Sequence, residues 1–166
     1  MLGIKKLIEY LKKNDITLST AESCTAGLIT SLVAEVPGSG QVLDRGFVTY
    51  APQAKHECLG VKYETIERYG LASGEVVAEM ALGALANRRG VVAVANTGLA
   101  EADGEMDGVI YFAWAMANDS GANVVTERVK FPGSRNQVRK AAAHYALEKI
   151  PLHIEYLSAG GVHTGG

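Results

Sequence analysis

Ser23 is the residue of this sequence whose surroundings point most directly to chemistry. It lies in residues 21–27 (AESCTAG), after a short β-branched apolar run and before a helical pattern. We therefore expect it at a strand-to-helix junction, beside main-chain N–H groups that attract anions and can stabilise an oxyanion. The same position suits an ordinary helix cap, and this segment alone leaves both interpretations open.

Lys55 is the candidate base for that serine, because a serine hydroxyl is a weak nucleophile at its ordinary pKa. It follows the second predicted strand, and its amine reaches Ser23 if both strands end on the same edge of the sheet. To accept a proton, the lysine pKa must fall from about 10.4 toward about 7, which costs about 4–5 kcal/mol. Burial can supply that shift. The alternative is a solvated surface lysine.

Arg135 and Arg139 form a candidate anion site at the start of the last predicted helix. They are four residues apart and so share one helix face. Cations at a helix N-terminus are unfavourable by about 0.3–1 kcal/mol each. A bound phosphate or carboxylate would offset this cost, whereas exposed arginines in water are the alternative.

Residues 97–108 form a loop after the predicted central strand, at the end where open α/β sheets bind ligands. Asp103, Glu105 and Asp107 imitate the start of a calcium loop, but its twelfth position is Trp114 and a strand follows. The four histidines also lack metal or catalytic spacing, so we expect no metal site. Cys24 is a rival nucleophile, although a small buried cysteine is the favoured interpretation.

The composition is that of one soluble globular domain. The chain has 166 residues, 48% of them apolar and 20% charged, with a formal net charge of −2. That balance argues against nucleic acid or an anionic membrane as partner, and no apolar run is long enough to cross a bilayer. Two cysteines without paired spacing and the absence of a signal-peptide pattern favour the cytoplasm.

Hydrophobic periodicity and turn residues predict strands alternating with helices, followed by a hairpin. This order predicts a three-layer α/β/α sandwich with a mixed, mostly parallel five-stranded sheet and one reversed strand. We expect a single domain over residues 1–157 and a mobile tail over 158–166. The predicted strands are 16–20, 42–50, 91–96, 109–117 and 124–131, and the predicted helices are 2–13, 25–35, 52–58, 63–69, 74–89 and 135–149.

Six blocks in order resemble one known family. The sequence is similar to the CinA C-terminal domain, the nicotinamide mononucleotide deamidase family, over about residues 3–150. The serine block is the most distinctive of the six. The blocks are residues 20–27, 36–39, 46–50 with Ala54 and Lys55, 59–61, 97–100 and 131–135.

The resemblance implies an amidohydrolase that releases ammonia from nicotinamide mononucleotide, a step of NAD salvage, without metal or organic cofactor. It implies Ser23 as nucleophile, Lys55 as base and Tyr50 beside them. A phosphate-bearing nucleotide is the implied small-molecule substrate. The residues expected to contact it are Cys24 and Thr25 through their N–H groups, Thr97, Gly98, Arg135 and, less directly, Arg139. Small size and family habit favour a homodimer or higher homo-oligomer.

The sequence departs from the family pattern around the substrate. Ala26 stands where the family has the first of two glycines, and Ala51-Pro52 replaces Ser-Asn after the tyrosine. The glycine-rich loop after Ala100 has become acidic, with Glu101 and Asp103 at its start. Two alternatives therefore remain: the same chemistry on a different small amide, and a catalytically idle domain that binds a ligand or a partner.

Overall fold

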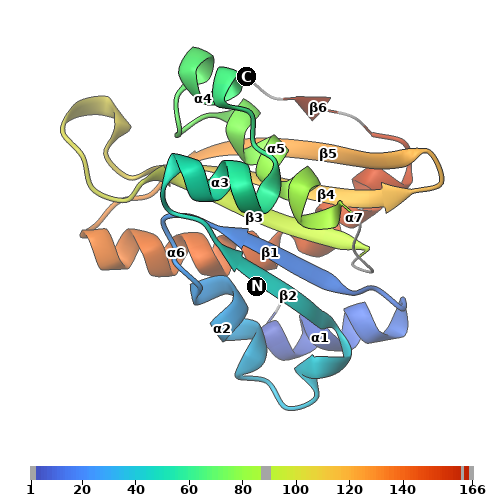
Figure 1. Ribbon diagram of the computed structural model, residues 1–166. Helices are drawn as coiled ribbons and strands as arrows, with labels where there is room; N and C mark the ends of the chain where they lie inside the picture. The colour runs from blue at the N-terminus through green and yellow to red at the C-terminus, as the bar shows by residue number, and fades with distance from the viewer. Residues whose placement is uncertain (1–2, 87–90, 162, 165–166) are drawn as a thin grey trace.

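The computed structural model describes residues 3–86, 91–161 and 163–164 as a central sheet with helices on both faces (Figure 1). The sheet order is β2-β1-β3-β4-β5-β6. The strands are β1 (Leu18–Glu22), β2 (Leu43–Val48), β3 (Val92–Leu99), β4 (Val109–Asn118), β5 (Gly121–Lys130) and the two-residue β6 (His163–Thr164).

Strand directions match the predicted mixed sheet. β1 pairs in parallel with both β2 and β3, whereas β4 is antiparallel to β3 and to β5. Among the five long strands, β4 alone is therefore reversed. The hairpin of β4 and β5 closes on the turn at Asn118–Gly121, where turn-forming residues predict it.

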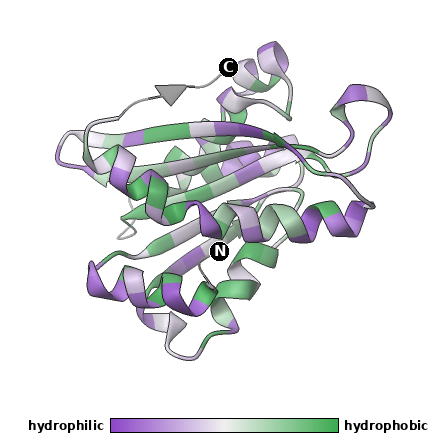
Figure 2. Cartoon of the chain, turned by 180° about the vertical axis from the view of Figure 1, so that it is seen from behind, coloured by the Kyte–Doolittle hydropathy of each residue, from purple (hydrophilic) through white to green (hydrophobic). Residues whose placement is uncertain are grey.

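Two apolar cores make the three layers. One lies between the sheet and α3 (Pro52–Leu59), α4 (Tyr63–Tyr69) and α5 (Gly74–Leu85). The other lies between the sheet and α1 (Ile4–Lys13), α2 (Leu28–Ala34), α6 (Arg135–Glu148) and α7 (Ile150–Ser158). In α1, hydrophilic and hydrophobic residues alternate along the helix (Figure 2), so that one face enters the core.

The carboxyl ends of β1, β2 and β3 meet at one edge. Glu22, the last residue of β1, is level with Val48 of β2 and Asn96 of β3. The segments that leave these strands therefore start side by side. The loop between β3 and β4, yellow at the left of Figure 1, projects from this side of the molecule.

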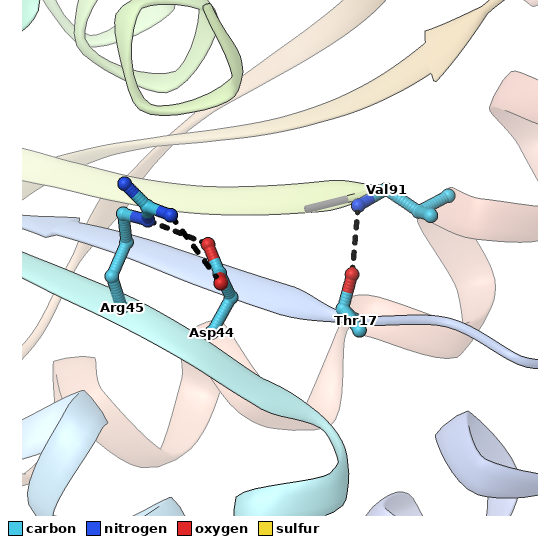
Figure 3. Close-up of polar contacts among 4 residues, drawn as sticks. All are labelled: Thr17, Asp44, Arg45 and Val91. Carbon is cyan, nitrogen blue, oxygen red and sulfur yellow. Dashed lines mark hydrogen bonds and ion pairs between the residues drawn. The ribbon is translucent and has the colours of Figure 1, made fainter. Parts of the chain in front are cut away.

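Two local polar contacts lie near the opposite ends of the same strands (Figure 3). The N–H of Val91 donates to Thr17 Oγ1 at 3.2 Å, which ties the starts of β1 and β3. The register of β1 and β2 shifts between Leu18 and Ser19, so that Asp44 is skipped in the pairing. Arg45 Nε donates to this Asp44 carboxylate at 2.6 Å.

The predicted elements are present, with differences at some of their ends. The helix expected from Thr25 begins only at Leu28, because β1 extends to Glu22 and the next five residues form a turn. Residues 87–89 of the helix expected over 74–89 lie outside the described residues. A seventh helix, α7, was not predicted, and Pro151 lies in its first turn.

The C-terminal tail, expected to be mobile, is described only in part. In that part, His163 and Thr164 pair with Val125 and Thr126 of β5, a contact that the sequence did not predict. Residues 162, 165 and 166 lie outside the described residues. The proposed domain boundary at 157 stays a prediction.

Gly83 lets α5 approach α3 closely. A Cβ atom at this position would lie 1.8 Å from the main-chain oxygen of Leu59, the last residue of α3. Only a hydrogen atom fits between the two helices here. Lys55 lies one turn earlier on α3, so this close contact helps to set the position of that lysine.

Candidate active site

Ser23 and Lys55 lie together at the carboxyl edge of the sheet. Lys55 Nζ is 3.0 Å from Ser23 Oγ, although the residues are 32 positions apart in the chain. Ser23 directly follows β1, and Lys55 lies on α3, which starts four residues after β2 ends. The sheet order therefore brings the two groups within hydrogen-bond distance, as the predicted strand ends require.

Lys55 is buried, with only 1% of its surface exposed. Its amine also donates to the main-chain oxygens of Thr49 at 2.8 Å and Tyr50 at 2.9 Å. In the described part of the chain, no carboxylate lies within ion-pair distance of this amine. Burial lowers the pKa of Lys55 to about 8, against a small opposing effect of Cys24.

The geometry around Lys55 suits a neutral amine that faces a hydroxyl. A neutral amine has two N–H donors and one lone pair, whereas an ammonium has three donors. The two carbonyls of Thr49 and Tyr50 can take both N–H groups. The lone pair then points at Ser23, whose hydroxyl proton it can accept.

Ser23 does not cap α2, so the helix-cap interpretation is wrong. The N-cap is Gly27, with a left-handed φ of 97°, and it makes no side-chain cap hydrogen bond. The Glu22 carboxylate serves this helix end, accepting from the N–H groups of Ile29 at 2.8 Å and Thr30 at 3.0 Å. Because Glu22 satisfies these groups, the Ser23 hydroxyl is left to Lys55.

Residues 23–27, between β1 and α2, form the serine loop. Glu22 and Asn96 hold this loop in place, and the sequence analysis assigned a role to neither. The buried Glu22 carboxylate also accepts from the Thr25 hydroxyl at 2.7 Å. The Asn96 amide donates to the same hydroxyl at 2.7 Å, while its main-chain oxygen accepts from the N–H of Ser23 at 3.2 Å. An acid at the end of a strand just before a helix was the available signal for Glu22.

Cys24 is a poor rival nucleophile. Its side chain is 5% exposed and lies 3.4 Å from Asn96 Oδ1, to which the thiol donates. Burial raises the pKa of the thiol to about 11, so the reactive thiolate is scarce at neutral pH. The thiol is thus the small buried cysteine that its neighbours predict.

Tyr50 contributes two separate groups. Its main-chain oxygen accepts from Lys55 Nζ, so the tyrosine contacts the base through its backbone. Its ring is half exposed, and the phenol oxygen accepts from Arg135 Nη2 at 3.0 Å. Tyr50 therefore joins the lysine to the start of α6, through its main-chain oxygen on one side and its phenol on the other.

Arg135 and Arg139 make different contacts, although their spacing places them on one helix face. Arg135 lines the cavity described below. Arg139 turns to the serine loop, where Nε donates to the Cys24 oxygen at 2.8 Å and Nη2 to the Thr25 oxygen at 3.2 Å. Its third donor group, Nη1, contacts the Asn136 side chain.

The other residues predicted to contact the substrate also differ in their positions relative to the cavity. Thr97 and Gly98 line the cavity, and the Thr97 hydroxyl donates to the Leu71 oxygen at 2.9 Å. A Cβ at Gly98 would lie 2.4 Å from the Val109 oxygen, so strand packing accounts for this glycine. The Thr25 side chain is fully buried, which leaves only its N–H group as a candidate contact.

A cavity of about 360 Å³ opens beside the pair, within the range that binds small molecules. Leu71 and Leu99 give it apolar walls, while Arg135 and Glu101 supply opposite charges. These two charges do not form an ion pair with each other in the described structure. The cavity is therefore suited to a molecule with an apolar body and separate polar groups.

The structure adds two observations on metals and membranes. Among the described residues, no group of three or more His, Cys, Asp or Glu side chains is arranged to hold a metal ion. Within residues 3–86, 91–161 and 163–164, none of the helices has both the length and the apolar character needed to span a bilayer.

Comparison with known proteins finds relatives that match most of the chain. The family model of the CinA C-terminal domain matches residues 4–153 of the chain. The chain belongs to the CinA C-terminal domain family. Nicotinamide-nucleotide amidohydrolase PncC of Escherichia coli (strain K12) is 40% identical over 146 residues, which is 86% of this CinA domain and 87% of that protein.

Solved CinA structures share the fold. The competence/damage inducible protein CihA from Agrobacterium tumefaciens has a TM-score of 0.82 at 35% identity, covering 90% of this chain and 92% of that one. A CinA superfamily protein from Escherichia coli has a TM-score of 0.80 at 32% identity, covering 89% and 88% of the two chains. The fold predicted from the sequence is thereby confirmed.

Proposed function

We propose that this CinA domain hydrolyses the carboxamide of nicotinamide mononucleotide and releases ammonia. The observation that carries the proposal is the 3.0 Å contact between Ser23 Oγ and the buried Lys55 amine, whose pKa burial lowers to about 8. The identity to nicotinamide-nucleotide amidohydrolase PncC supports an amide-hydrolase activity. The substrate and the serine–lysine mechanism are our inference.

In the first step, Ser23 Oγ forms a bond to the carboxamide carbon while Lys55 Nζ takes the hydroxyl proton. The carbonyl π electrons move to oxygen, where the N–H groups of Cys24 and Thr25 are the candidate donors. In the described part of the chain, no main-chain carbonyl accepts from either of these N–H groups.

Collapse of this intermediate breaks the C–N bond and leaves an acyl group on Ser23. Lys55 returns the proton to the departing nitrogen, so that ammonia leaves. A water molecule then attacks the ester, again with Lys55 as base, and frees the carboxylic acid and Ser23. Lys55 returns each proton that it takes, once during acylation and once during hydrolysis, so the reaction balances without a cofactor.

Arg135 is the proposed contact for the phosphate of the nucleotide. Its guanidinium lies at the cavity, tied to the Tyr50 phenol, and planar guanidinium groups suit phosphate oxygens. Glu101 is the feature that favours a second candidate substrate. A carboxylate at the same cavity repels a nearby phosphate, which supports the same chemistry on another small amide.

The test is ammonia release from nicotinamide mononucleotide by the purified wild-type chain and by Ser23→Ala and Lys55→Ala. We expect turnover by the wild type and no measurable turnover by either variant. Ser31→Ala, at an exposed serine of α2, is the matched control and should keep full activity. Folded wild-type protein that releases no ammonia would refute the proposed substrate, and a panel of small carboxamides then tests the second candidate.

A further inference from the structure

We propose that Arg139 is a positioning residue that orients the N–H group of Thr25, one of the two candidate oxyanion donors of the serine loop. This inference rests on the hydrolytic chemistry proposed above. Three nitrogens of its guanidinium have defined acceptors: Nε and Nη2 donate to the Cys24 and Thr25 oxygens, and Nη1 donates to Asn136 Oδ1 at 3.0 Å. Arg139 therefore acts on the loop from the side of α6.

Peptide geometry links the Cys24 carbonyl, which Arg139 contacts, to the N–H group of Thr25. In a trans peptide, the carbonyl and the following N–H point in opposite directions in one plane. Fixing the Cys24 oxygen therefore fixes the N–H of Thr25. The Ser23 oxygen accepts from the N–H of Ala26 at 3.0 Å, which fixes the N–H of Cys24 in the same way.

The N–H groups of Cys24 and Thr25 and the Arg139 charge act together on the Cys24 thiol. They lower its pKa, whereas burial, the largest effect, and the Glu22 charge raise it. Cys24 lines the same cavity as Ser23, so these groups lie next to the nucleophile.

The contacts of Arg139 hold a loop whose backbone is strained. Ala26 adopts a left-handed φ of 50°, which costs a residue with a side chain about 1–2 kcal/mol. Asn96 holds the start of the loop from β3, and Arg139 holds its middle from α6. A lysine cannot fully replace the arginine, because only a guanidinium presents two donors in a fixed fork to two carbonyls.

The inference predicts that Arg139 affects the chemical step more than substrate binding. For Arg139→Gln, we expect kcat to fall about 10- to 100-fold with KM within twofold of the wild-type value, since one oxyanion donor is worth about 10²–10³ in kcat. The matched variant Arg135→Gln should instead raise KM. Guanidinium ion added to Arg139→Ala should restore part of kcat, whereas ammonium should not.

A substrate-independent probe separates this inference from the proposed function. A fluorophosphonate bonds to Ser23 Oγ with loss of fluoride while Lys55 takes the proton, and its phosphoryl oxygen uses the same N–H groups. We expect labelling of Arg139→Gln to be at least tenfold slower than that of the wild type and of Lys140→Gln, a control at an exposed lysine of α6, at equal folded fraction by circular dichroism. This result supports the inference even if nicotinamide mononucleotide is not the substrate.

Three outcomes would overturn the inference. The first is equal labelling rates for Arg139→Gln and the wild type. The second is a raised KM with unchanged kcat, which would return Arg139 to anion binding. The third is a wild-type chain that the fluorophosphonate does not label at Ser23.

Discussion

Two polar clusters of this protein differ in the partners that surround their charged groups. In the Ser23–Lys55 cluster, the buried amine contacts one hydroxyl and two carbonyls. In the second, the Glu127 cluster, a carboxylate accepts from the Tyr145 hydroxyl at 2.5 Å and lies 2.9 Å from His153 Nε2. A cavity of about 460 Å³ adjoins the Glu127 cluster, so cavity size does not separate the two.

The difference lies in which proton states each cluster stabilises. Burial lowers the pKa of His153, but the Glu127 carboxylate opposes that shift. Burial and the hydrogen bond to Glu127 both raise the pKa of Tyr145, which keeps its phenol protonated. Among the residues that the structure describes, no such carboxylate contacts Lys55, so burial is the main effect on its pKa. The buried Lys55 amine can exchange a proton near neutral pH, whereas the Tyr145 phenol of the Glu127 cluster stays protonated.

Removing the amine should give the largest effect. For Lys55→Met, kcat/KM should fall about 10³- to 10⁴-fold, because Ser23 loses its base while the buried volume stays filled. Ammonia release measures this loss. Lys62→Met, at an exposed lysine just after α3, should keep wild-type activity. A Lys55→Met variant with more than a tenth of wild-type activity would contradict the assigned base.

The pH dependence should follow the lysine. Because burial lowers the pKa of Lys55 to about 8, the neutral amine is the minor form below that pH and the major form above it. We expect kcat/KM to rise about tenfold per unit below pH 8 and to level off above it. Ammonia release between pH 6 and 9.5 gives the profile. A flat profile over that range would mean that Lys55 does not titrate as the base.

A change in the Glu127 cluster should alter stability and leave catalysis unchanged. Tyr145→Phe keeps the ring against Phe112 and Phe131 but removes the hydroxyl that donates to Glu127. We expect the free energy of unfolding to fall by about 1–2 kcal/mol. Urea unfolding measures this change, and Tyr156→Phe, at an exposed tyrosine, is the control. A loss of kcat in Tyr145→Phe would show that the clusters are coupled.

The smallest expected effect is a gain of stability in the serine loop. Ala26→Gly removes the penalty of the left-handed backbone at φ 50° and should stabilise the fold by about 0.5–1 kcal/mol. The same change at Ala141, inside α6, should destabilise it by a similar amount. Thermal unfolding of both variants compares them. Destabilisation by Ala26→Gly would mean that the alanine methyl has a packing role that outweighs the backbone strain.

The sheet and the proximity of its polar residues could be predicted from the sequence. Alternating strand and helix patterns place Ser23 and Lys55 after neighbouring parallel strands, and such strands end on one edge. A pattern that indicates α7 is also present in the sequence. It consists of the helical spacing of Ile150, Ile154 and Leu157, with Pro151 in the first turn.

The supporting contacts could not be predicted in the same way. Arg139 and the amine of Lys55 bind main-chain oxygens, which any residue type supplies and no motif marks. The same holds for Tyr50, whose carbonyl contacts the base while its more distinctive phenol contacts Arg135. Spacing alone treats Arg135 and Arg139 as equivalent, and only the position of the serine loop separates them.

The absence of a side chain at Gly83 affects the position of α3 from outside the cavity. Any Cβ there must push the end of α3 away from α5, because the Leu59 oxygen already occupies that space. Lys55 lies on the same helix, one turn before Leu59. The close contact at Gly83 therefore helps to keep α3 where Lys55 is buried, and that burial lowers the pKa of its amine.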